Sequence, residues 1–166
     1  APTFRHLEYK EYKAGRKAMP PELVMQMPLM KDVLRAMNIS VLELEGFEAD
    51  DIIGTVARIG EEQGLNPLII TGDRDALQLV TEKTEVLITK KGITDFEIYT
   101  PEKMQERYNL TPTQFIDLKG LMGDSSDNIP GIPGVGEKTG IKLLEQFGSI
   151  DNLLENTDKI TAAKLR

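Results

Sequence analysis

The chain has 166 residues and a formal net charge of -7 at pH 7, and its 40% hydrophobic and 28% charged content is typical of a globular domain that can bury a core. It has no cysteine and one histidine, His6, which excludes disulfides, thiolate nucleophiles and metal sites built from cysteines or several histidines. No apolar run approaches the ~20 residues of a membrane-spanning helix and no signal peptide opens the chain, so we expect a cytoplasmic protein without membrane contact.

Charge is segregated along the sequence. Residues 1–17 carry five basic side chains against two acidic ones, whereas residues 48–75 carry seven acidic side chains against two basic ones. The net negative charge argues at first against a nucleic-acid partner, because lysine and arginine normally bind phosphates. The segregation answers this objection, since a negatively charged substrate can be held at an acidic site that is loaded with cations.

The first part of the chain predicts alternating helices and strands. Pro20-Pro21 begins a long amphipathic helix whose apolar residues continue to Met37, and Pro28 either bends this helix or marks its true start. The elements predicted next are a strand at 40–44, a helix at 48–62, a strand at 67–71 and a short helix through 76–79. This order predicts a parallel sheet flanked by helices, with ligands at the carboxyl ends of its strands.

The pattern becomes helical after a predicted hairpin. The hairpin pairs strands at 85–89 and 95–99 through residues 90–92. The helices that follow are predicted at 101–108, 111–121, 137–147 and 149–154, with threonine caps before the first two and a loop rich in Gly, Asp and Pro at 123–136. We therefore predict an α/β core at 1–99 and a helical subdomain at 100–166.

Clustered carboxylates follow the first two predicted strands. Glu48, Asp50 and Asp51 lie where a helix begins, and the helix dipole explains any one of them, but three acids in four residues repel one another unless a cation is near. Asp73 and Asp75 repeat the arrangement after the next strand, although a short Asp-x-Asp also occurs in phosphatases and helix caps. A hard, oxygen-preferring ion such as Mg²⁺ would relieve the repulsion.

Three further segments have both a functional and an ordinary explanation. Asp124 and Asp127 could bind metal, but an Asx turn or helix cap explains each as well. Residues 131–139 could hold a phosphate with backbone amides, or form a plain helix-helix turn. The basic head alternates cations with an aromatic ring, as a surface that binds phosphates and stacks a base requires, but it could equally be a solvated charged face; its residues are Arg5, Tyr12, Lys13 and Arg16.

Taken in order, these motifs closely resemble the 5′-nuclease domain of bacterial DNA polymerase I, a branch of the flap endonuclease family with a PIN-like fold. The matching segments are FRH followed by EYKAGR, GFEADDIIGT, TGDRDALQLV, KKGITD, LKGLMGDSSDNIPGIPGVGEKT and KLLEQFGS. They span nearly the whole chain, and so many ordered matches are specific. The resemblance implies a PIN-like α/β core followed by a helical subdomain with a helix-hairpin-helix element at 131–147.

The resemblance also implies site residues and ligands. It assigns to a cluster for two or more Mg²⁺ or Mn²⁺ ions the acids Glu48, Asp50, Asp51, Asp73, Asp75, Asp124 and Asp127. The helix-hairpin-helix element would grip duplex DNA, with help from a potassium ion, through Gly134, Gly136, Lys138 and Thr139. The family's arch segment, where a displaced 5′ strand passes, resembles the part of this chain that holds Arg5, Tyr12, Lys13 and Arg16.

One departure from the family pattern bears on activity. The family begins with a strand that carries a metal-binding aspartate, and a further aspartate precedes the position of Ala1. Neither is found in this sequence. We therefore expect the leading strand and part of the metal site to be missing, and the chain either cuts flap or nicked DNA or only binds it.

The implied function is that of a 5′-3′ exonuclease and flap endonuclease in replication and repair, including primer removal and nick translation. We hypothesise two divalent ions roughly 4 Å apart with water as the nucleophile, Asp73 among the most important ligands, and Lys13 and Arg16 stabilising the phosphate in the transition state. The chain is expected to act as a monomer, alone or within a polymerase polypeptide. A more distant alternative is a phosphatase-like hydrolase with Asp73 or Asp75 as the nucleophile.

Overall fold

The computed structural model describes residues 2–92 and 94–160, and it divides into two compact units. Unit 1 is the chain up to Ile52 together with Ser126–Asn128, and unit 2 is the remainder. The division falls within helix α3 (Ala49–Glu62). The end of the predicted helical subdomain, residues 161–166, lies outside the described residues.

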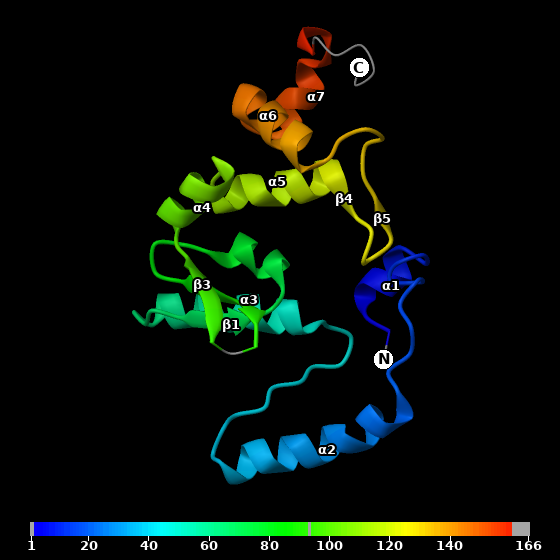
Figure 1. Cartoon of the computed structure of the whole chain (residues 1–166), viewed down its shortest axis with the longest axis vertical. Coiled ribbons are helices and arrows are strands. Elements are labelled where there is room, and N and C mark those ends of the chain that lie inside the picture. Colours follow the sequence, from blue (N-terminus) through cyan, green and yellow to red (C-terminus); the bar gives the residue numbers. More distant parts are fainter. Residues whose placement is uncertain (1, 93, 161–166) are drawn as a thin grey trace. The chain divides into compact units, whose positions relative to one another are not determined.

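Unit 1 is helical where it is regular. It contains α1 (Phe4–Glu8), α2 (Pro21–Ala36) and the first turn of α3. The predicted long helix is confirmed: it begins at Pro21, where the first turn tolerates a proline, and Pro28 lies inside it. The short helix α1 has no counterpart among the predicted elements. Figure 1 shows α2 as one continuous helix, followed by irregular chain up to α3.

The strand predicted at Ser40–Leu44 is wrong. This segment forms neither helix nor strand, and the side chains of Leu42 and Leu44 are 61% and 59% exposed. A strand is stabilised by hydrogen bonds to a neighbouring strand, and the described residues of unit 1 contain none with which it could pair. Alternating apolar residues are therefore not sufficient here to make a strand.

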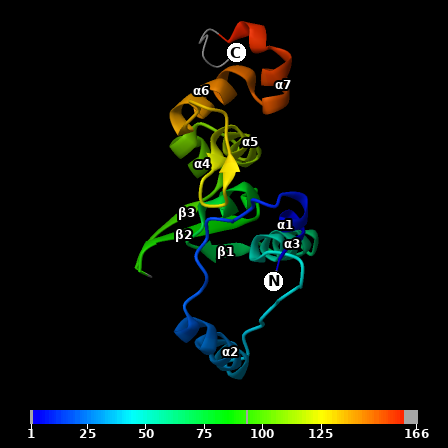
Figure 2. The same cartoon turned by 90° about the vertical axis from the view of Figure 1, so that its right-hand side faces the viewer.

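Unit 2 contains a three-stranded sheet in the order β1 (Leu68–Thr71), β2 (Glu85–Lys91), β3 (Asp95–Tyr99). Strands β1 and β2 are parallel and are connected through the short 3₁₀ helix η1 (Arg74–Leu79), whereas β2 and β3 form the predicted antiparallel hairpin. Figure 2 shows the three strands side by side. Within the described residues the sheet is thus mixed, since β2 and β3 are antiparallel. It has one parallel pair, β1 and β2, because the strand predicted at 40–44 does not form.

The helices of unit 2 agree with the predicted ones to within two residues at each end. The predicted helices are α4 (Pro101–Tyr108), α5 (Pro112–Met122), α6 (Glu137–Phe147) and α7 (Ile150–Glu155), and the 3₁₀ helix η2 (Thr157–Lys159) that follows them was not predicted. Thr100 and Thr111 cap α4 and α5 as predicted, since each side-chain oxygen accepts a hydrogen bond from the third backbone amide of its helix. The predicted loop also contains a small antiparallel pair, β4 (Gly123–Asp124) and β5 (Ile129–Pro130).

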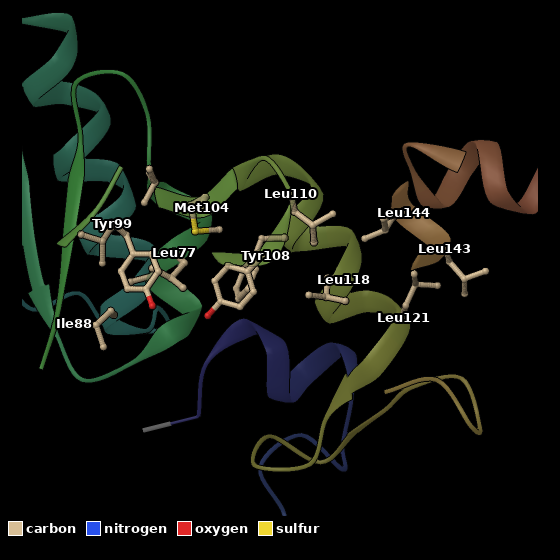
Figure 3. Close-up of a cluster of buried hydrophobic side chains, with 14 of the residues drawn as sticks. Leu77, Ile88, Tyr99, Met104, Tyr108, Leu110, Leu118, Leu121, Leu143 and Leu144 are labelled. Carbon is tan, nitrogen blue, oxygen red and sulfur yellow. The ribbon is translucent and has the colours of Figure 1, made fainter. Parts of the chain in front are cut away.

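One apolar core joins the sheet and helices of unit 2. Leu77 of η1 and Met104 of α4 are fully buried, as are Leu118 and Leu144 within 1%. Figure 3 shows these side chains as one cluster from the strands to α6. Helices α5 and α6 approach closely because α6 has Gly140 at the crossing, where a Cβ atom would lie 2.6 Å from a methyl group of Leu118. The core therefore anchors the acid-bearing turns at 73–75 and 123–124, because Ala76 and Leu121 beside them are buried in it.

Candidate functional site

The first acid cluster lies at the start of α3 in unit 1. The side chain of Asp51 accepts a hydrogen bond of 2.8 Å from the backbone amide of Glu48, as the third residue of a helix does in a capping box. Both side chains are largely buried, with 14% and 22% exposed, whereas Asp50 is exposed. The helix start therefore directs Glu48 and Asp51 into one place, as their spacing suggests.

Arg5 neutralises Asp51. Its two terminal nitrogens donate hydrogen bonds of 2.8 and 2.7 Å to the two carboxylate oxygens of Asp51, a bidentate geometry that fixes both groups. A second, longer ion pair of 3.8 Å joins Arg5 to Glu48. The hydrogen bond from Arg5 lowers the pKa of Asp51 below its ordinary value, and the same bond raises the pKa of Arg5.

Lys13 and Tyr12 lie between Glu48 and Asp127. The ammonium of Lys13 is 2.7 Å from Glu48 and 3.7 Å from Asp127, and the hydroxyl of Tyr12 is 2.9 and 3.1 Å from oxygens of the same two carboxylates. Arg16 adds an ion pair of 2.6 Å to Asp127. Two carboxylates from distant parts of the sequence are thus held around one cation.

The backbone of Lys13 is itself constrained. Its φ of 56° lies in the left-handed region, which a side chain such as lysine rarely adopts, and its amide donates a hydrogen bond of 2.9 Å to the carbonyl of Asp127. Asn128 donates from its side chain to the carbonyl of Glu11 at 2.7 Å. These bonds hold Ser126–Asn128 against the basic head, and strain of this kind often accompanies functional sites.

Burial and ion pairing shift the pKa values of this group. Burial acts to raise the pKa of Glu48, but hydrogen bonds from Lys13 and Tyr12 outweigh it and the pKa is lowered. Burial acts to lower the pKa of Lys13, but the neighbouring carboxylates outweigh it and the pKa is raised. Burial, with smaller contributions from Glu48 and Asp127, raises the pKa of Tyr12 to about 12. At neutral pH Glu48 is therefore ionised and Lys13 is protonated.

Tyr12 is not arranged to stack a base in this conformation. Only 5% of the residue is exposed, the ring of His6 contacts it edge-on at 5.1 Å, and the ammonium of Lys13 lies 4.8 Å from its centre. Its hydroxyl orients two carboxylates instead. A contact between Tyr12 and DNA stays a prediction.

The second acid pair follows β1 in unit 2. Asp73 caps η1, because its side chain accepts a hydrogen bond of 2.9 Å from the amide of Asp75. This is the ordinary explanation that the sequence left open, and it leaves the second oxygen of Asp73 on an exposed residue. Asp75 points into the ion pair described next.

Asp75 and Asp124 are brought together by a residue that the sequence analysis missed. The ammonium of Lys119, in the last turn of α5, lies 2.8 Å from Oδ1 of Asp75 and 2.7 Å from Oδ2 of Asp124. A basic residue at a helix C-terminus is usually explained by the helix dipole, so the sequence offered only a weak signal. The lysine lies four residues before the loop at 123–136 and in the same family-like segment as Asp124, which hints that it could face that loop.

Close backbone packing sets the position of Asp124. Gly123 has φ of 71°, and a Cβ atom there would lie 2.2 Å from the amide nitrogen of Gly131. A Cβ atom at Gly131 would lie 2.0 Å from the carbonyl oxygen of Met122. Only glycine fits at both positions, so the two strands β4 and β5 meet where α5 ends and Asp124 follows at once.

The acids suit a divalent ion by chemistry, although they converge in pairs. Within residues 2–92 and 94–160, no three or more acidic or imidazole side chains are arranged to hold a metal ion. Glu48 and Asp127 share one ammonium, and Asp75 and Asp124 share another. Mg²⁺ is commonly held by one or two carboxylates and keeps several waters, so each pair fits such an ion.

The predicted helix-hairpin-helix residues lie at the start of α6. Gly134 needs its glycine, since its φ is 86°, and Gly136 is the N-cap of α6, with no atom within 4 Å of the place where a Cβ would be. Lys138 is exposed and Thr139 is half-buried. The turn therefore presents bare backbone beside a helix N-terminus, which is a favourable place for a phosphate.

Models of one protein family match the whole chain. One, described as 5′-3′ exonuclease, N-terminal resolvase-like domain, matches residues 1–109, and another, described as 5′-3′ exonuclease, C-terminal SAM fold, matches residues 110–166. The chain belongs to the 5′-3′ exonuclease family. This membership confirms the predicted fold class, a PIN-like α/β domain followed by a helical subdomain.

Related proteins agree with the family models. DNA polymerase I of Bacillus subtilis (strain 168) is 59% identical over 164 residues, and that of Geobacillus stearothermophilus is 55% identical over the same length. Each match covers 99% of this chain but only 19% of the relative, so the chain spans about a fifth of the length of these relatives.

Solved structures share the fold. T5 5′-exonuclease with bound divalent zinc ions has a TM-score of 0.81 at 25% identity, covering 99% of this chain and 64% of that one. The catalytic core of Rad2 in complex with DNA substrate (complex III) has a TM-score of 0.64 at 19% identity, covering 95% and 48%. In the described part of this chain, no helix has the length and apolar character needed to cross a membrane.

Proposed function

We propose that this chain is the nuclease module of a metal-dependent 5′-3′ exonuclease and 5′-flap endonuclease that hydrolyses DNA phosphodiesters in replication and repair. The observation that carries this proposal is the pairing of carboxylates around lysine ammonium groups in a chain of the 5′-3′ exonuclease family. Two relatives of this chain are DNA polymerase I, so we also propose that it works within such a polypeptide, as a single copy.

In this proposal the acids bind Mg²⁺ or Mn²⁺. Glu48, Asp51 and Asp127 in unit 1, and Asp75 and Asp124 in unit 2, supply oxygen ligands from side chains already oriented by hydrogen bonds. The exposed acids Asp50 and Asp73 are open to solvent and are ligands directly or through water. When bound, the ions activate water and stabilise the leaving oxygen of the phosphodiester.

The basic head would bind the phosphate. The Arg16 side chain is 54% exposed, so its guanidinium can reach a phosphate while Lys13 stays beside the carboxylates. Lys13 and Arg16 would then stabilise charge that develops on the phosphate in the transition state, and Arg5 would position Asp51 or contact phosphate. Lys13 and Arg16 are close enough to the acids for this role, since they lie 2.7 Å from Glu48 and 2.6 Å from Asp127.

The helix-hairpin-helix residues would hold duplex DNA away from the chemistry. Gly134 and Gly136 leave backbone amides accessible, Lys138 adds charge and Thr139 a hydroxyl. A potassium ion bound at this turn would add positive charge that helps to hold the phosphate. Such contacts read no sequence, as a nuclease that acts on structure requires.

The test is cleavage of a 5′-labelled flap duplex with Mn²⁺ or Mg²⁺ and with chelator, using wild type, Asp75→Asn and the matched surface control Asp151→Asn. We expect metal-dependent cutting near the junction, a loss of about 100-fold or more in Asp75→Asn, and no loss in the control, since metal ligands supply several kcal/mol to the transition state. Binding without cutting in the wild type would instead support a DNA-binding module. Cutting that survives chelator would contradict the proposal.

A further inference from the structure

Lys119 occupies the position of a cation between two acids. Its ammonium lies within 2.8 Å of Asp75 and 2.7 Å of Asp124, which come from η1 and from β4, elements far apart in the sequence. The side chains of Lys119, Asp75 and Asp124 are 32%, 30% and 16% exposed. All three lie in unit 2, and Ala76 and Leu118, the neighbours of Asp75 and Lys119 in sequence, belong to its apolar core.

From this geometry we infer that Lys119 is a positioning residue that holds Asp75 and Asp124 together before a divalent ion binds and competes with that ion for them. The inference rests on the proposed function, which makes these two acids metal ligands. It concerns a lysine that lies within a segment matching the family but is not among the predicted site residues.

The positive charge of Lys119 has two opposite effects on this pair of carboxylates. Without a cation, two carboxylates this close would repel one another, and the ammonium removes that repulsion with two charge-assisted hydrogen bonds. A divalent ion between the same oxygens meets a positive charge only a few ångströms away, which opposes its binding. The lysine thus keeps the acids oriented while it weakens their affinity for metal.

The ammonium stays charged throughout the physiological range. Burial acts to lower the pKa of Lys119, but the hydrogen bonds to Asp124 and Asp75 outweigh it, so the pKa is raised. A divalent ion bound by Asp75 and Asp124 would have to displace this ammonium or lie beside it.

The experiment measures Mn²⁺ binding directly, by the loss of the free-ion signal in electron paramagnetic resonance, in the absence of DNA. The variants are Lys119→Met, Lys119→Gln and Lys119→Arg, with circular dichroism to verify folding. The matched control is Lys103→Met, because Lys103 also pairs with two acids, Glu97 and Glu106, and its side chain is 30% exposed.

Lys119→Met and Lys119→Gln are expected to bind Mn²⁺ about tenfold more tightly than wild type, since they remove one unit charge beside the site. Lys119→Arg, which keeps the charge, and Lys103→Met are expected to match wild type. The gain should disappear when Asp124→Asn is added to Lys119→Met, which assigns it to this pair. In chelator, Lys119→Met should lower the midpoint of thermal unfolding more than Lys119→Met does in the Asp124→Asn background.

Two failures can be told apart. If wild type binds Mn²⁺ and Lys119→Met and Lys119→Gln bind it equally or less tightly, the competition is refuted while the proposed metal site stands. If neither wild type nor any Lys119 variant binds Mn²⁺, the metal proposal and this inference both fall.

Discussion

The two units are stabilised by different interactions. Unit 2 has a continuous apolar core with side chains such as Leu77 and Leu144 fully buried. Among the described residues of unit 1, Tyr12 is the single buried hydrophobic side chain, and what joins the basic head to α3 is a set of ion pairs around Glu48 and Asp127. The stability of unit 1 should therefore be sensitive to the loss of a charge and to bound metal, whereas the stability of unit 2 should be sensitive to the loss of side-chain volume.

The largest effect is expected in the apolar core. Leu77→Ala should cost about 2–5 kcal/mol in free energy of unfolding, because it deletes fully buried methyl groups and leaves a cavity. The matched change Leu29→Ala on α2, where the side chain is 65% exposed, should cost no more than about 0.5 kcal/mol. Urea unfolding followed by circular dichroism measures both, and similar losses for the two variants would refute the contrast.

A smaller effect is expected from the ion pairs of unit 1. Lys13→Met should destabilise this unit by about 1–2 kcal/mol in metal-free buffer, since Glu48 and Asp127 are only 14% and 15% exposed and lose their shared ammonium. Hydrogen exchange of the amides at 49–52 reports the loss. The control Lys31→Met removes an ion pair with Glu43, which is 59% exposed, and should change exchange little.

Bound metal should reduce the destabilisation caused by Lys13→Met. The positive charge of Lys13 stabilises the metal-free unit, but it opposes the binding of a divalent ion by Glu48 and Asp127. Lys119 is inferred to act in the same way on Asp75 and Asp124. Saturating Mn²⁺ should therefore reduce the difference in exchange between Lys13→Met and wild type. An unchanged difference would mean that no ion binds at Glu48 and Asp127.

The smallest effect is expected from acid. The pKa values of Glu48 and Asp51 are lowered on folding, so their contribution to stability is complete above the unfolded values of about 4.3 and 3.9 and is lost as pH falls through the folded values. We expect amide chemical shifts at 49–52 to change below about pH 4 in metal-free buffer while those of the buried core of unit 2 do not. Simultaneous changes in both units would show that they unfold together.

The sequence by itself determined the family and most of the helices, although α1 and η2 were not predicted. The signals that mark a helix lie within a few residues of one another; they are threonine caps, prolines in first turns and apolar residues at helical spacing. Such local signals predicted α2, α4, α5 and α6 correctly. The order of the motifs identified the 5′-3′ exonuclease family. The acid-bearing turns at 48–51, 73–75 and 124–127 were also evident, because they follow from residue type and spacing alone.

The tertiary structure decided what depends on residues far apart in the chain. The segment Ser40–Leu44 alternates like a strand, but a strand also needs a neighbour to pair with. Tyr12 could have been an exposed stacking ring, but it is buried and its hydroxyl donates hydrogen bonds to two carboxylates. Lys119 has no role assigned from the sequence, and only the folding of η1 and β4 beside α5 places it between Asp75 and Asp124, since electrostatic partners are set by distance in space.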